Sequence, residues 1–213
     1  MEPKRPLVRE PFSGISHFFG AILSVVGLIV LLLAAHGRPW LTLGYAMFGG
    51  SLVLLYMTSA LYHSLHVSPQ RLNDLMHCDH SAIYLLIAGT YAPLCLEPLR
   101  TGWGLKLLAA EYLLALIGIT CVFVFDSKPD WLRVLLYMGM GWLALLAMPA
   151  LFHALSSAAM AWLIAGGLFY TIGTIFYATQ RPRLWPGKFG AHDLWHVFVL
   201  AGSGCHFMMM LLI

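Results

Sequence analysis

Two histidines one helical turn apart open the last apolar run of the chain. They are His192 and His196, in the segment HDLWH, and the run continues as VFVLAGSGCHFMMMLLI. Residues four positions apart lie on the same face of a helix, so both imidazoles can point the same way into a bundle. Histidine pairs with this spacing are a common way for a helix to bind zinc. The spacing therefore predicts two ligands of a metal site.

A third histidine, an acid and a serine stand near the ends of two earlier apolar runs. His63 closes one run in SALYHSL, Ser59 lies four residues before it, and Asp79 opens the next run in HCDHSAIYLL. Three histidines would leave a tetrahedral zinc one open position, which is the ligand count of a catalytic site. That position would hold a water with its pKa lowered toward ~7. Asp79 would accept a proton from the water or orient a ligating imidazole, and Ser59 would hydrogen-bond the water or Asp79.

The plainer interpretation is that histidines at the ends of membrane helices only contact lipid headgroups. Three helices delivering polar residues to one depth favour the metal site instead, because ionisable residues within membranes are costly and are usually functional. Three more histidines lie near that depth and are interpreted as interfacial or supporting residues, each an alternative ligand: His66, His77 and His80. Asp193 is explained by its position at the start of a helix, where the helix dipole favours a negative charge.

Other ionisable residues are assigned outside the metal site. His206 lies ten residues beyond His196, or roughly 15 Å along a helix, which is too far for the same ion. His206 is expected to make a hydrogen bond to a neighbouring helix. His17, near the same depth as the site, is expected to make a local hydrogen bond, and Glu111 has no evident partner.

Composition indicates that the solvent around this chain is lipid. Hydrophobic residues make up 60% and charged residues 10% of its 213 residues, against roughly 45–50% and about 25% in soluble domains. The net charge of +3 is too small and too dispersed to indicate nucleic-acid binding. The four cysteines form no CxxC pair and are interpreted as small packing residues.

The apolar runs predict an all-α integral membrane protein, a bundle of seven transmembrane helices. A spanning helix needs about 20 apolar residues. Residues 1–13 are expected to form a short basic N-terminus and residues 14–213 a single transmembrane domain. Pro93 and Pro149 are expected to kink or end their helices. The expected spans are 14–35, 41–62, 78–97, 103–125, 131–149, 158–179 and 191–212.

Loop charges predict that the N-terminus is cytoplasmic and the C-terminus outside. Cytoplasmic loops carry an excess of lysine and arginine. This orientation places nine such residues inside (Lys4, Arg5, Arg9, Arg71, Lys128, Arg133, Arg181, Arg183, Lys188) and three outside (Arg38, Arg100, Lys106). The metal site then lies at the cytoplasmic end of the bundle.

Three blocks of sequence resemble the signature blocks of the hemolysin III proteins, within the superfamily of the progestin and adiponectin receptors. The blocks are SALYHS, DHSAIYLLIAGTYAP and HDLWHVFVLAGSGCHF. The resemblance covers nearly the whole chain, including EPFSGISHFFG and YMGMGWLAL. It implies zinc ligands from helix two (His63) and helix seven (His192 and His196). It also implies that Asp79 holds the zinc-bound water and that Ser59 is the family's serine. Glu10 and His17 look like a family-typical pair without an assigned role.

Three functions stay open from the sequence. The first is a zinc-dependent hydrolase of lipid amides or esters, with a membrane lipid as substrate; the resemblance implies a ceramidase-like activity and a part in membrane lipid homeostasis. The second is a pore-forming cytolysin. The third is a receptor or sensor of membrane state with a structural zinc. The resemblance also implies a bacterial inner membrane.

Overall fold

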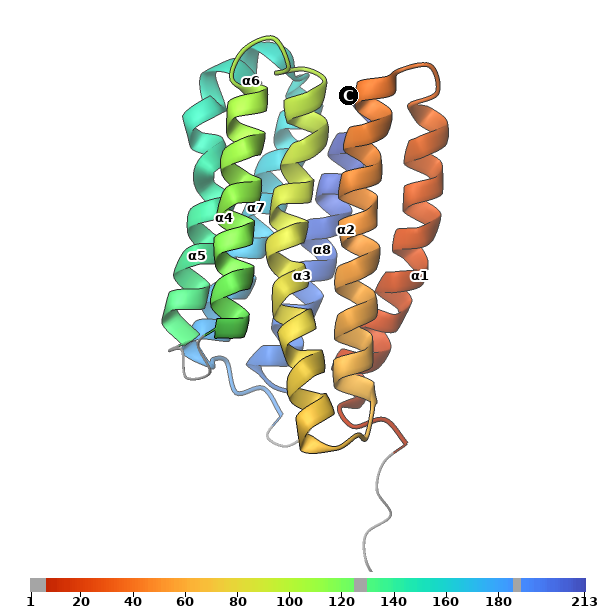
Figure 1. Cartoon of the computed structure of the whole chain (residues 1–213), viewed down its shortest axis with the longest axis vertical. Coiled ribbons are helices and arrows are strands. Elements are labelled where there is room, and N and C mark those ends of the chain that lie inside the picture. The colour runs from red at the N-terminus through yellow and green to blue at the C-terminus, as the bar shows by residue number, and fades with distance from the viewer. Residues whose placement is uncertain (1–6, 125–129, 186–188) are drawn as a thin grey trace, which may run out of the picture.

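A computed structural model describes residues 7–124, 130–185 and 189–213. Its helices run side by side along the long axis of the molecule (Figure 1). No strand occurs in these ranges, and one isolated bridge joins Trp185 to Phe189. The elements are α1 (Pro11–Ala34), α2 (Pro39–Ser64), α3 (Pro69–Leu96), α4 (Gly104–Val124), α5 (Asp130–Trp142), the 3-10 helix η1 (Leu143–Ala147), α6 (Met148–Ala154), α7 (Ser157–Thr179) and α8 (Ala191–Met210).

Within the described ranges the helices form seven rods, because α5, η1 and α6 follow one another along a single rod. Among the described residues, five rods have the length and hydropathy of a membrane span: α1, α2, α4, α7 and the combined rod Trp131–Ala154. The other two, α3 and α8, carry the acid and the histidine pair of the expected site. The chain is therefore an all-helical membrane protein, as the sequence predicts, and its two less apolar rods bring polar residues into the bundle.

Helix α3 starts at Pro69, nine residues before the expected membrane span 78–97. Ser68 is the N-cap and its hydroxyl accepts a hydrogen bond from the backbone N–H of Arg71, while proline suits the first helical position. The apolar run shows only the part of the helix that lies within the bundle. Asp79 consequently lies in the third turn of α3 rather than at its start.

The fifth rod is interrupted where Pro149 follows η1. Proline has no backbone N–H and its ring crowds the carbonyl four residues earlier, here that of Leu145. The chain tightens into the 3-10 segment Leu143–Ala147 before α6 starts. Pro93 stays inside α3, which ends three residues later at Leu96.

Close backbone contact joins α2 to α3. A Cβ added at Gly44 would come within 2.7 Å of the Cα of Pro93, so only glycine allows this approach. The contact matters for the site because α2 carries His63 and α3 carries Asp79.

The expected site residues lie at one end of the bundle. The starts of α1, α3, α5 and α8 lie at that end with the last turns of α2, α4 and α7, and the C-terminus lies at the other (Figure 1). That this end is cytoplasmic stays a prediction from loop charge. Four of the charges behind it lie outside the described residues: Lys4, Arg5, Lys128 and Lys188.

Candidate metal centre

Histidines from α2 and α8 form a compact group. One ring nitrogen of each of His63, His192 and His196 lies within 4.8 Å of the other two. The Nε2 atoms of His192 and His196 are 2.9 Å apart across one turn of α8. The ring centroid of His63 lies 4.7 Å from that of His196. His63 and His196 are buried, so little water competes for their nitrogens.

Hydrogen bonding leaves His63 in the form that binds a cation. Its Nδ1 lies 2.5 Å from Oε2 of Glu10. This hydrogen bond holds the pKa of Glu10 below its ordinary value, and an ionised carboxylate only accepts, so Nδ1 carries the hydrogen. Nε2 of His63 then presents a lone pair and has no hydrogen-bond partner among the described residues. A buried, unpaired imidazole nitrogen beside two more imidazoles fits a divalent cation such as zinc.

Asp193 holds the start of α8 rather than joining the histidine group. Its Oδ2 accepts a hydrogen bond from the backbone N–H of Gly190 at 2.9 Å. Its Oδ1 accepts one from the hydroxyl of Ser13 at 2.8 Å. The first turn of α8, which carries His192, is thereby capped and tied to α1.

A second set of polar side chains lies directly beside the histidines. Asp79 is 6% exposed, and its carboxyl lies within interaction range of Ser59 and His63. The Ser59 hydroxyl is 2.8 Å from Nδ1 of His17, whose ring centroid is 3.9 Å from that of His196. His17, Ser59 and Asp79 thus form a connected polar group from three helices next to the three histidines.

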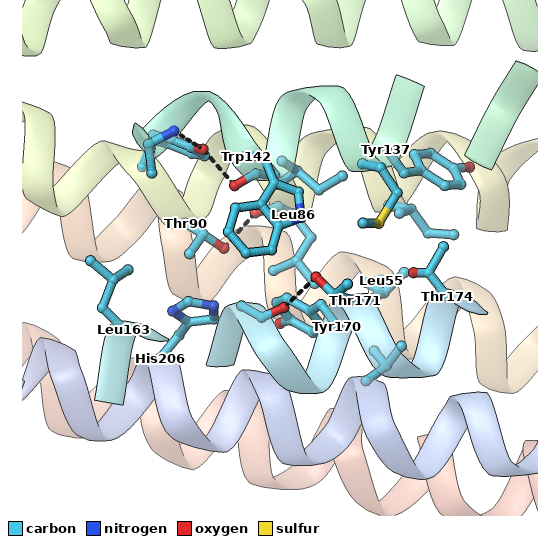
Figure 2. Close-up of a pocket in the computed structure, with 18 of the residues that line it drawn as sticks. Leu55, Leu86, Thr90, Tyr137, Trp142, Leu163, Tyr170, Thr171, Thr174 and His206 are labelled. Carbon is cyan, nitrogen blue, oxygen red and sulfur yellow. Dashed lines mark hydrogen bonds between the residues drawn. The ribbon is translucent and has the colours of Figure 1, made fainter. Parts of the chain in front are cut away.

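An apolar cavity of about 180 Å³ starts at this polar group. Its wall includes His17, Ser59 and Asp79, and it extends to His206 on α8. Figure 2 shows Tyr137 and Thr174 toward one end and Leu163 and His206 toward the other, with Trp142 facing the interior between them. The cavity therefore joins the polar group to the interior of the bundle.

The alternative ligands do not belong to the histidine group. His77 packs edge-on against Phe123, with ring centroids 5.4 Å apart. His80 accepts a hydrogen bond from Arg133 at 3.1 Å through its Nδ1. His66 lies in the loop between α2 and α3.

Two further buried residues lie away from the histidines. Nδ1 of His206 makes no hydrogen bond in the described residues, and its ring packs against Tyr170 and Gly166 of α7. The hydrogen bond expected there is therefore not made by this atom, because the ring meets an aromatic face and backbone on α7. Both carboxylate oxygens of Glu111 are buried and also lack a partner in these residues.

Sequence reasoning expected a local hydrogen bond for His17 and gave Glu10 no role. The expectation for His17 is wrong, because its ring contacts Ser59 on another helix, α2. Glu10, Ser13 and His17 recur at the spacing of one helical face, and each bonds a residue at the site, namely His63, Asp193 and Ser59. Polar residues at this spacing at the start of an apolar helix were the available signal. Their partners lie on other helices, which spacing within one segment cannot reveal.

The described residues form a bundle of seven helical rods, with a group of three histidines at one end. The profile of the family described as haemolysin-III related matches residues 6–207, so the chain belongs to that family. It is 38% identical to the hemolysin-3 homolog of Bacillus subtilis (strain 168), over 95% of this chain and 92% of that protein. Identity to hemolysin-3 of Bacillus cereus is 39%, over 95% and 90%. The adiponectin receptor protein of Drosophila melanogaster is 28% identical over 76% of this chain and 40% of its own length.

Proposed function

We propose that this protein is a zinc-dependent hydrolase of lipid amides or esters. One observation carries the proposal: a histidine group able to hold a metal adjoins a buried carboxylic acid and a serine that open into an apolar cavity. A hydrolase needs these three parts together, whereas a purely structural metal needs only the ligands.

His63, His192 and His196 would hold the metal, one from α2 and two from α8. Zinc with three protein ligands and an open position polarises a carbonyl and lowers the pKa of water. The unpaired Nε2 of His63 and the close Nε2 atoms of the α8 pair support this assignment.

Asp79 would transfer the proton during hydrolysis, and Ser59 would orient its carboxyl group. Asp79 is positioned to take a proton from the attacking water and to return it to the leaving group, as a general base and then a general acid. Ser59 lies between His17 and Asp79, so its hydroxyl can fix the direction in which the carboxyl points. Burial of both side chains keeps bulk water away from this exchange.

The cavity supports a lipid as the substrate. Its wall is mainly apolar, with isolated polar groups such as Thr90 and Thr171, which is typical of pockets for apolar ligands. A carbonyl at the polar end would leave an acyl chain in the cavity between α3, α5 and α7. Residues 14–213 would act as one transmembrane domain, and the Bacillus relatives favour a bacterial plasma membrane.

A membrane-state sensor with a structural metal is the second candidate, because a relative is named an adiponectin receptor protein. The polar group of Asp79 and Ser59 beside the histidines favours the hydrolase, since a structural site would not require it. Metal-loaded protein that turns over no lipid, yet changes conformation with lipid composition, would favour the sensor.

The test is turnover of a panel of ceramides and phospholipids by the purified, zinc-loaded protein in detergent. We expect release of fatty acid from at least one lipid, lost with a chelator and restored by zinc. The matched variants are His63→Ala, which removes a ligand, and His77→Ala, which removes a histidine outside the group. Turnover that persists in His63→Ala would contradict the proposal.

A further inference from the structure

We propose that Glu10 is a positioning residue for the metal site: its carboxylate fixes the tautomer and the orientation of the His63 ring. The inference rests on the proposed function in so far as His63 is a metal ligand. It concerns the residue just before α1, whose side chain contacts another helix, α2.

The backbone of this segment is attached to the last turn of α2. The N–H of Glu10 donates to the carbonyl of His63 at 2.8 Å, and the N–H of Arg9 donates to the carbonyl of Ser64 at 3.2 Å. Carbonyls in the last turn of a helix otherwise lack partners. These two bonds bring the Glu10 side chain to the histidine on the same turn.

The carboxylate of Glu10 is held at both oxygens. Oε1 lies 2.8 Å from NH1 of Arg9, and Oε2 lies 2.5 Å from Nδ1 of His63. Arg9 is itself fixed, because NH2 donates to the carbonyl of Tyr62 at 2.6 Å and the guanidinium lies 4.7 Å from the centre of the Tyr62 ring. The carboxylate therefore has one preferred direction, toward the imidazole.

This arrangement determines which nitrogen of His63 is free. With Nδ1 donating to Glu10, the lone pair is on Nε2, the nitrogen that lacks a partner. Ligating histidines usually donate their other N–H to a carboxylate, a carbonyl or water, and losing that partner typically weakens metal binding about 10–100-fold. Without Glu10 the ring is free to rotate and to carry its hydrogen on Nε2, where it blocks a ligand.

A second acid provides a matched control. Glu97 also forms an ion pair with an arginine between segments, from its Oε1 to NH2 of Arg38 at 2.9 Å. The pair lies at the opposite end of the bundle, between the start of α2 and the end of α3, away from the histidine group. Glu97→Ala removes an ion pair of the same kind without touching the site.

The experiment measures Zn²⁺ affinity by competition with a chromophoric chelator, together with the visible spectrum of the Co²⁺-loaded protein. Wild type, Glu10→Ala, Glu10→Asp and Glu97→Ala are compared as full chains in detergent. We expect about 10–100-fold weaker Zn²⁺ binding and an altered Co²⁺ spectrum for Glu10→Ala, with wild-type values for Glu97→Ala. Glu10→Asp, with a carboxylate one methylene shorter, is expected to show a smaller change of the same kind.

Glu10→Ala with wild-type affinity and an unchanged Co²⁺ spectrum would overturn the inference, and so would an equal loss in Glu97→Ala. If Glu10→Ala does not fold, Glu10→Asp decides: wild-type behaviour overturns the inference and weaker binding supports it. Wild-type protein that binds no Zn²⁺ would instead overturn the proposed metal function, so the two failures are distinguishable.

Discussion

The Nε2 atoms of His192 and His196 face one another 2.9 Å apart across one turn of α8. Two nitrogens this close are either hydrogen-bonded to each other or ready to share a cation. His63 on α2 adds a third nitrogen within 4.8 Å, and its Nε2 has no partner in the described residues. The arrangement therefore favours a shared cation, and the predictions below separate its ligands from the residues that act beside it.

Asp79→Asn should abolish most turnover while leaving zinc bound. The amide has nearly the shape of the carboxyl but cannot accept a proton, so a loss of about 10²–10⁴-fold in kcat is expected. Zinc content measured on the same sample is the control. Near-normal kcat in zinc-loaded Asp79→Asn would rule out this residue as the proton carrier.

Ser59→Ala should have a milder effect. It removes one buried hydroxyl that contacts His17 at 2.8 Å and adjoins Asp79. The loss of one such hydrogen bond corresponds to about 1 kcal/mol, so kcat should fall several-fold to about tenfold. Zinc content should be unchanged, and a loss of zinc in this variant would make Ser59 part of the metal shell instead.

Gly44→Ala should destabilise the protein, whereas Gly50→Ala on the same helix should not. A Cβ at Gly44 would meet the backbone of Pro93 on α3 at 2.7 Å, but one at Gly50 meets nothing within 4 Å. Overpacking of this kind costs about 1–3 kcal/mol. The thermal unfolding midpoints of the two variants in detergent measure this difference in stability. Equal midpoints would show that α2 and α3 can move apart at Gly44 without a loss of stability.

Liposomes that contain the protein should retain an encapsulated dye. A pore needs a polar path across the whole membrane, whereas the wall of the described cavity is mainly apolar. Release at low protein-to-lipid ratio, unaffected by His63→Ala, would favour a pore-forming cytolysin over the hydrolase.

The sequence predicted the helical class and the rods well, because apolar runs of about 20 residues mark membrane helices. Helix α3 extends beyond the apolar run that marks the expected span 78–97, since its polar first turns after Ser68 resemble a loop in hydropathy. The break expected at Pro149 is confirmed, because the 3-10 segment Leu143–Ala147 interrupts the rod just before this proline.

At the site, spacing within one helix was enough to pair His192 with His196, and shared depth suggested His63. The contacts of Glu10, Ser13 and His17 could not be predicted, because each crosses between helices. Such contacts depend on how the rods pack against one another. Glycines such as Gly44 allow close packing, but they do not determine by themselves which helices become neighbours.

The central claim is that His63, His192 and His196 hold a metal ion, and the zinc content of purified protein tests it most directly. We expect about one zinc per wild-type chain, and its loss in His63→Ala and in His196→Ala. His77→Ala is the control and should keep its zinc. Wild-type protein that is free of zinc after purification and after incubation with Zn²⁺ would show that these histidines do not form a zinc site.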